Sequence, residues 1–129
     1  MNERRALVAI VDDDPRMLES LEDLMESAGY AVRTFLSARA LLADGLQSVD
    51  VLITDIGMPG TDGFELRDLM RKAHPKVPVF LITGRHEIAD QNRAHGISGF
   101  FRKPFDSEAL LTAVSDALRA GPNSGAHEG

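Results

Sequence analysis

The sequence predicts a doubly wound α/β domain, in which helices cover both faces of a parallel sheet. Short apolar runs rich in Val, Ile and Leu alternate with segments of helical spacing, and the alternation recurs five times. The central runs are apolar almost throughout, which indicates strands that are buried on both faces. Because the chain has no cysteine, its core has to be held by hydrophobic packing rather than by disulfides.

The first strand is expected over 6–11 (ALVAIV), and a helix follows it. Asp14 is placed to cap the N-terminus of that helix, and Pro15 suits the first helical position. Gly29 is a typical signal for the helix C-terminus. Between these limits one face of the helix is apolar, formed by Leu18, Leu21, Leu24, Met25 and Ala28.

The middle of the chain contributes two strands and the start of another helix. The run 31–35 (AVRTF) alternates, as an edge strand does, whereas 50–54 (DVLIT) is apolar up to its end. Further on, the stretch from Asp62 to Glu65 fits an Asp variant of the capping box. A helix is therefore expected to begin just after Asp62.

The last third begins with a fourth strand over 77–82 (VPVFLI) and includes a short fifth strand over 98–101 (SGFF). The segment between them has few apolar residues, so a short or mobile fourth helix is expected over 86–95. Asp106 or Ser107 can cap the last helix. Its apolar face is formed by Leu110, Leu111, Val114, Ala117 and Leu118.

Length and charge limit the class of protein. A chain of 129 residues fits one domain, expected over 5–119, with 120–129 as a disordered tail or the start of a linker. The net charge of −6 argues against direct nucleic-acid binding and against binding to anionic membranes. No apolar run reaches the roughly 18 residues that a membrane span needs, and the N-terminus does not fit a signal peptide. A cytoplasmic protein is expected.

Reactive side chains follow four of the five predicted strands. In a doubly wound sheet, ligands bind beyond the carboxyl ends of the strands. Asp12 and Asp13 follow the first strand, Asp55 the third, Thr83 the fourth and Lys103 the fifth. Residues that are scattered in sequence are therefore expected to meet at one edge of the sheet.

The chemistry of these side chains favours a metal and a phosphoryl group. Three carboxylates that repel one another form a good site for Mg²⁺, and the backbone carbonyl of Gly57 could add a further oxygen. Asp55 can also attack phosphorus and form an aspartyl phosphate. The hydroxyl of Thr83 and the ammonium of Lys103 suit the oxygens of a transferred phosphoryl group.

Each of these residues alone has a simpler explanation. An aspartate at the end of a strand is usually a cap or a solvated turn residue, and Asp14 is assigned to that class. The four histidines of the chain show no ligand spacing. The functional interpretation depends on five residues that occur together, after four different predicted strands. They are Asp12, Asp13, Asp55, Thr83 and Lys103.

Four motifs resemble those of receiver domains (CheY-like) of bacterial two-component response regulators. They are "VDDD" after the first strand, "DIGMPGTDGFEL" after the third, "LITG" after the fourth and "FFRKPF" at the fifth. The resemblance spans about residues 5–119. It implies a flavodoxin-like (βα)5 fold with a five-stranded parallel sheet in the order 2-1-3-4-5.

The resemblance also implies roles for individual residues. Asp55 would be the phosphoacceptor, and Asp12 and Asp13 would hold Mg²⁺, with Asp13 a direct ligand. Thr83 would hydrogen-bond to the phosphoryl group, and Lys103 would pair with it. Phe100 would be the switch aromatic that rotates inward when Thr83 moves.

Partners follow from the same resemblance. The phosphodonor would be a phosphohistidine on a histidine kinase or phosphotransfer protein. The surface made by the fourth helix, fifth strand and fifth helix would then change and control a downstream effector or fused output domain. Such a domain catalyses only its own phosphorylation and dephosphorylation, and it can form a homodimer when phosphorylated.

Two residues depart from the family's usual pattern. Gly57, two positions after Asp55, offers no side chain next to the attacking water, and Arg85, two positions after Thr83, places a large cation at the phosphoryl group. We expect this pair to set the lifetime of the phosphorylated state.

Two other functions stay open on the sequence alone. The chain could be a receiver-like interaction module that is never phosphorylated, although the intact set of five site residues argues against it. It could also be a Mg²⁺-dependent phosphatase with Asp55 as nucleophile. That reaction needs a general acid near Asp55, and Ile56 and Gly57 supply none.

Overall fold

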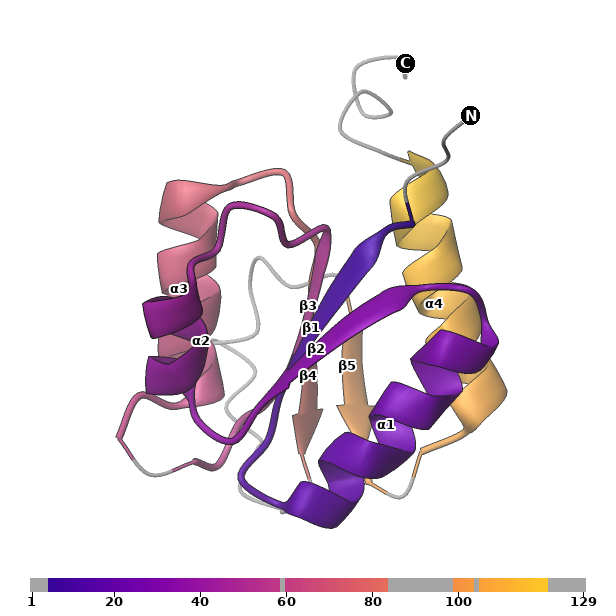
Figure 1. Ribbon diagram of the computed structural model, residues 1–129, viewed down its shortest axis with the longest axis horizontal. Helices are drawn as coiled ribbons and strands as arrows, with labels where there is room; N and C mark the ends of the chain where they lie inside the picture. Colours follow the sequence, from indigo (N-terminus) through magenta and orange to yellow (C-terminus); the bar gives the residue numbers. More distant parts are fainter. Residues whose placement is uncertain (1–4, 59, 84–98, 104, 121–129) are drawn as a thin grey trace.

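A computed structural model describes residues 5–58, 60–83, 99–103 and 105–120. Its centre is a five-stranded parallel sheet in the order β2-β1-β3-β4-β5, with helices on both faces (Figure 1). The predicted fold class and strand order are thus confirmed. The strands are β1 (Leu7–Val11), β2 (Ala31–Phe35), β3 (Val51–Asp55), β4 (Val79–Thr83) and β5 (Gly99–Arg102). The described helices are α1 (Pro15–Ser27), α2 (Ala38–Asp44), α3 (Gly63–Ala73) and α4 (Ser107–Ala120).

The strands begin and end within two residues of the predicted bounds. The fourth strand starts at Val79 rather than at residue 77, because Pro78 has no amide hydrogen to donate to the sheet. The third starts at Val51, and the carboxylate of Asp50, just before it, accepts the Leu7 amide at 2.8 Å. It ends at Asp55, which pairs with Ile82 as the last residue of β3.

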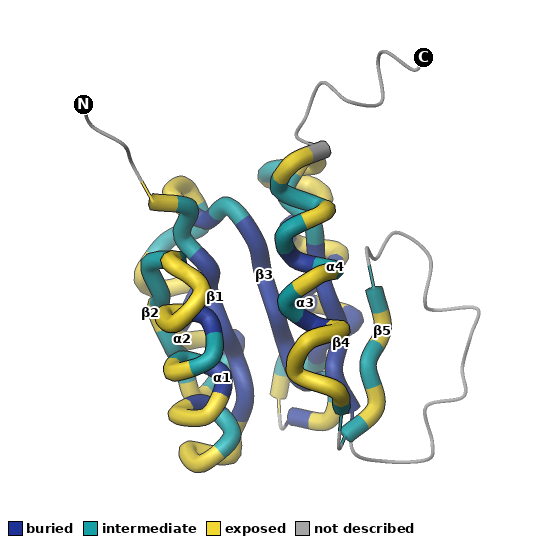
Figure 2. The backbone as a smooth tube through the Cα atoms, turned by 90° about the vertical axis from the view of Figure 1, so that its right-hand side faces the viewer, coloured by how far each residue is buried: buried dark blue, intermediate teal, exposed yellow. Residues whose placement is uncertain are grey.

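The two faces of the sheet bury different residues of the same strands, as the alternation of side chains requires. One face carries α1 and α4, and the other carries α2 and α3 (Figure 1). On β1, Val8 and Ile10 pack toward α1 and α4, whereas Ala9 and Val11 pack toward α2 and α3. The central strands are therefore buried on both sides (Figure 2).

Side-chain caps set the helix starts at the predicted positions. The carboxylate of Asp14 accepts the Arg16 amide at 3.0 Å, and Pro15 is the first residue of α1. Asp62 and Glu65 form a reciprocal capping box, with hydrogen bonds of 2.9 and 3.0 Å. For the last helix, the carboxylate of Asp106 accepts the Glu108 amide at 3.1 Å, so Asp106 provides this hydrogen bond at its start.

The C-terminus of α1 also agrees with its predicted signal. The helix ends at Ser27, with Ala28 as its cap, and Gly29 has a φ of 97°. That left-handed conformation is one that glycine adopts without the steric penalty of a side chain. The prediction of Gly29 as the end of this helix is confirmed.

One predicted element falls in the part of the chain that is not described. The expected fourth helix over 86–95 lies between β4 and β5, outside the described residues, as does Arg85. Among the helices that are described, none is long and apolar enough to cross a membrane.

Candidate functional site

Four neighbouring strands bring polar side chains to the carboxyl edge of the sheet. Asp12 and Asp13 directly follow β1, and Asp55 is the last residue of β3. Thr83 ends β4, and Lys103 directly follows β5. Since all the strands are parallel, these residues lie at the same edge.

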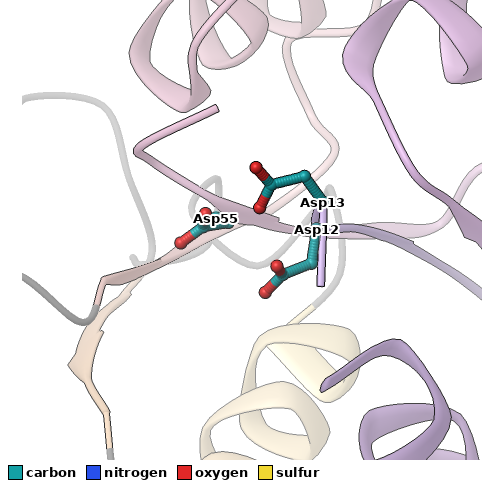
Figure 3. Close-up of side chains that lie close together, drawn as sticks. All are labelled: Asp12, Asp13 and Asp55. Carbon is teal, nitrogen blue, oxygen red and sulfur yellow. The ribbon is translucent and has the colours of Figure 1, made fainter. Parts of the chain in front are cut away.

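Three carboxyl groups form the centre of the site. One oxygen from each of Asp12, Asp13 and Asp55 lies within 4.8 Å of the others (Figure 3). Asp12 and Asp55 are buried, with exposed fractions of 2% and 8%, whereas Asp13 is exposed. Three like charges at this separation repel one another strongly where two of them are shielded from water.

Lys103 supplies a positive charge to both buried carboxylates. Its ammonium lies 3.1 Å from Asp12 Oδ2 and 3.5 Å from Asp55 Oδ1. The other oxygen of Asp12 accepts the backbone amide of Asp14 at 2.9 Å, so both oxygens of this carboxylate are engaged. The Lys103 amide also donates to the Thr83 carbonyl at 2.7 Å, which ties the end of β5 to the end of β4.

The electrostatics of the site follow from burial and from these charges. Burial raises the pKa of Asp55, and the carboxylates of Asp12 and Asp13 raise it further, while Lys103 partly opposes them. Burial alone would lower the pKa of Lys103. Its hydrogen bond to Asp12 and the charge of Asp55 outweigh burial, so the pKa of Lys103 is raised and its ammonium stays charged.

This donor set fits a small, hard cation. Among the described residues, three carboxylates face one ammonium, which leaves an excess of negative charge that a divalent ion would neutralise. Mg²⁺ prefers carboxylate oxygens and usually keeps several waters, which the exposed position of Asp13 allows.

Thr83 reaches the same edge from β4. Its backbone pairs with Arg102 of β5, and Asp55 of β3 pairs with the preceding residue, Ile82. Thr83 is buried, with an exposed fraction of 2%. Thr83 therefore lies on β4, between β3, which ends at Asp55, and β5, which Lys103 directly follows.

Comparison with known proteins identifies this arrangement. The family model of the response regulator receiver domain matches residues 8–115. The chain belongs to this family. Acidic sets such as Asp12, Asp13 and Asp55 are typical of the Mg²⁺ site in receiver domains.

Individual relatives agree with this assignment. The chain is 36% identical over 125 residues to the response regulator protein TmoT of Ectopseudomonas mendocina, covering 95% of this chain and 57% of TmoT. It is 40% identical over 116 residues to the C4-dicarboxylate transport transcriptional regulatory protein DctD of Pseudomonas aeruginosa, covering 86% of this chain and 25% of DctD. The chain thus spans little more than half of the first relative and a quarter of the second.

A solved receiver domain has the same fold. The CheY-like receiver domain protein from Methanospirillum hungatei superposes with a TM-score of 0.83 at 25% sequence identity, covering 90% of this chain and 95% of that one. The flavodoxin-like receiver fold implied by the sequence motifs is confirmed.

The receiver domain carries Phe100 on the face of β5 that turns away from α1 and α4. Phe101 packs against the core beneath those helices, and its neighbour Phe100 is 39% exposed. Phe100 also differs in strand parity from Lys103, so the aromatic ring and the ammonium leave the chain toward opposite faces.

Two residues near the site were assigned no role at the site from the sequence. Thr54 Oγ1 donates to the Asp55 carbonyl at 3.0 Å, although Thr54 looks like an ordinary strand residue in the sequence. Gly63 lies against the backbone of Asp55, yet the sequence shows it only as part of a capping box. A glycine directly after a cap, where helix propensity disfavours it, is the signal that could have indicated a close approach.

Proposed function

We propose that Asp55 accepts a phosphoryl group from a phosphohistidine on a histidine kinase or phosphotransfer protein. The observation that carries this proposal is the position of the Asp55 carboxylate. It ends a buried strand, lies within 4.8 Å of two further carboxylates and has the Lys103 ammonium at 3.5 Å. A carboxylate held among charges of both signs is suited to phosphoryl chemistry rather than to capping.

The transfer needs the ionised form of Asp55. A carboxylate oxygen attacks phosphorus, the new P–O bond forms, and the bond from phosphorus to the histidine nitrogen breaks. The leaving imidazole keeps the bonding electron pair and takes a proton from water. Lys103 favours the reactive carboxylate, because its positive charge opposes the rise in the pKa of Asp55 that burial causes.

Mg²⁺ would be held by Asp12, Asp13, Asp55 and the backbone carbonyl of Gly57. When bound, this ion would neutralise the negative charge that accumulates on the phosphoryl oxygens. Asp13 is exposed and able to ligate directly, whereas both oxygens of Asp12 are already engaged by Asp14 and Lys103. Direct ligation by Asp13 is therefore the arrangement we favour.

Thr83 and Lys103 would bind the oxygens of the transferred group. A phosphoryl group on Asp55 carries about two negative charges and three acceptor oxygens. Lys103 already lies within 3.5 Å of the Asp55 carboxylate. Thr83 would donate its hydroxyl from the end of the neighbouring strand.

Movement of Thr83 would be transmitted to Phe100. The ring of Phe100 is 39% exposed on β5, which leaves an apolar side chain that an inward rotation would bury. We propose that this rotation changes the surface formed by residues 86–95, β5 and α4, and that a partner recognises the change. The helix labelled α4 is the one that the sequence predicts as the fifth helix.

Gly57 and Arg85 would set the lifetime of the phosphorylated state. A Cβ added at Gly57 meets no atom of the described residues within 4 Å, and we propose that the space beside the site is open to the water that hydrolyses the phosphoryl group. Arg85, which lies outside the described residues, would place its charge near the same group.

The output would be a downstream effector or a fused output domain. DctD is described as a transcriptional regulatory protein, and this chain covers a quarter of its length. We propose residues 5–119 as the signalling unit, with residues 120–129 as a tail or as the start of a linker. Because the whole chain has a net charge of −6, this unit would act through protein contacts, including a phosphorylation-dependent homodimer, rather than by binding nucleic acid itself.

Intact mass after incubation with acetyl phosphate and Mg²⁺ tests the proposal. We expect one phosphoryl group on the wild type and none on Asp55→Asn, with a chelator abolishing the label. Asp44→Asn is the matched control, because Asp44 pairs with Arg33 on the surface and takes no part in the site. A label that persists in Asp55→Asn would show that the acceptor is wrong.

The same experiment distinguishes the proposed phosphoacceptor from an interaction module that is never phosphorylated. If the wild type takes no label under conditions that label a control receiver domain, the chain is a receiver-like interaction module that is not phosphorylated.

A further inference from the structure

The first residue of α3 lies directly against the backbone of Asp55. A Cβ built on Gly63 would collide with the Asp55 carbonyl oxygen, and it would lie 2.9 Å from Ile56 Cα and 3.1 Å from the Asp55 carbonyl carbon. These neighbours are backbone atoms, which cannot rotate away as a side chain can. Gly63 does not have a positive φ, so this close approach, rather than the backbone conformation, is what excludes a side chain there.

The same stretch of backbone is held from several directions. Thr54 Oγ1 donates to the Asp55 carbonyl at 3.0 Å. The Ile56 amide donates to the Ile82 carbonyl at 3.0 Å, and the Ile56 carbonyl accepts the Gly63 amide at 3.1 Å. The peptide that follows Asp55 is therefore fixed between β4, a strand hydroxyl and the start of α3.

The helix itself has little freedom to retreat. Its first turn is closed by the capping box of Asp62 and Glu65. Below that turn, Phe64, Leu66 and Met70 are buried in the core between α3 and the sheet. A side chain at position 63 would therefore displace the Asp55–Ile56 peptide at least in part, and with it the direction of the Asp55 side chain.

We propose that Gly63 is a positioning residue for Asp55. Because Gly63 has no side chain, α3 can pack directly against the Asp55 carbonyl. This contact keeps the Asp55 carboxylate close to Asp12, Asp13 and Lys103. Only the purpose of that carboxylate rests on the function proposed above; the placement itself can be measured without phosphorylation.

The test compares two glycines whose added Cβ would collide with a neighbour. In Gly63→Ala the collision is with the Asp55 backbone. In the control, Gly99→Ala, the Cβ would lie 2.7 Å from the Phe80 ring, at the end of β5 away from Lys103. The measurements are the melting temperature, the affinity for Mg²⁺ by calorimetry, and the rate of labelling by acetyl phosphate.

We expect both variants to melt at a lower temperature, and only Gly63→Ala to lose function at the site. Its affinity for Mg²⁺ and its labelling rate should each fall by about tenfold or more, since a displacement near 1 Å can cost about a hundredfold in rate. If Gly63→Ala is folded and matches Gly99→Ala in both quantities, Gly63 has only a packing role and the proposal is overturned.

A second variant decides the question if Gly63→Ala does not fold. Thr54→Val removes the other contact to the same carbonyl oxygen at nearly constant volume. We expect a smaller loss of Mg²⁺ affinity, and an unchanged affinity would overturn the proposal. Labelling and metal binding also separate the two hypotheses: a wild type that binds Mg²⁺ but takes no label refutes the proposed function, while the Mg²⁺ affinities still test the role of Gly63.

Discussion

The ammonium of Lys103 donates a hydrogen bond to the carboxylate of Asp12 across 3.1 Å, joining two residues that are 91 positions apart in sequence. Asp12 is almost completely buried, and the lysine side chain is 21% exposed. This pair connects the end of the first strand to the end of the last, and it gives one of the buried carboxylates its counterion.

Replacing Lys103 by Met should weaken both the fold and the chemistry. Asp12 would lose the partner of a buried carboxylate, which costs about 1–3 kcal/mol in the free energy of unfolding. Labelling of Asp55 by acetyl phosphate should slow by about a hundredfold, the typical effect of losing one donor to a developing charge. Urea denaturation and a time course of intact mass measure the two effects. Lys103→Arg keeps the charge as a control, and equal labelling of Met and Arg variants would contradict the role of the ammonium.

Asp55 should make the fold less stable as the pH rises. Its folded-state pKa lies above the ordinary value of 3.8, mainly because of burial. Between these two values the folded state binds a proton that the unfolded chain has lost, so the free energy of unfolding falls with increasing pH. Asp55→Asn should therefore be more stable than the wild type at neutral pH in the presence of a chelator. This difference in stability should vanish below about pH 3.8. If the melting temperatures of the wild type and Asp55→Asn differ by the same amount at every pH, the raised pKa of Asp55 is refuted.

Mg²⁺ should stabilise the wild type through Asp13. Binding to the folded state alone contributes about 2.7 kcal/mol when the free ion is at a hundred times its dissociation constant. Asp13→Asn should lose most of this gain and keep the metal-free stability, because Asp13 is exposed. Thermal melting with and without Mg²⁺ measures both, with Asp44→Asn as the surface control. A full Mg²⁺ effect in Asp13→Asn would mean that the ion binds elsewhere.

Asp62→Ala should destabilise the domain by about 1 kcal/mol, the usual effect of removing an N-cap. The Asp62 side chain accepts the Glu65 amide, and the reciprocal bond, from the Asp62 amide to the Glu65 carboxylate, depends on the same geometry. Urea denaturation of Asp62→Ala, Glu65→Ala and the double variant gives the coupling between them. If the two losses simply add, the capping box does not act as a unit.

A side chain at Gly57 should change the lifetime of the label without affecting the fold. Because an added Cβ meets no atom within 4 Å in the part of the chain that the structure describes, Gly57→Asn should melt at the wild-type temperature. The amide would hydrogen-bond to the attacking water and alter the rate of label loss. The decay of the intact-mass signal after removal of acetyl phosphate measures this rate. An unchanged decay after exchange of both Gly57 and Arg85 would disprove their proposed role.

Strand–helix alternation and the motifs at the strand ends predict the fold and the members of the site. Apolar runs with a reactive residue just beyond them are local features, and in a parallel sheet their ends must share an edge. Asp12, Asp13, Asp55 and Lys103 could be named together for this reason, although they follow or end three different strands, β1, β3 and β5.

Contacts that depend on three-dimensional packing could not be predicted in the same way. The engagement of Asp12 by both Lys103 and the Asp14 amide depends on the orientation of one carboxylate. The contact of Gly63 with Asp55 depends on the depth at which α3 packs against the sheet. Asp106 and Ser107 were equivalent as caps in the sequence, and only the hydrogen bond to Glu108 distinguishes them.

The order of the strands has a consequence for biosynthesis. Asp55 emerges from the ribosome well before Lys103, and β5 adds to the outer edge of the sheet beside β4. A nascent chain that ends before Lys103 therefore contains the three carboxylates of the site without their lysine counterion. A product truncated before Lys103 would leave the buried carboxylates of Asp12 and Asp55 without the ammonium that pairs with them.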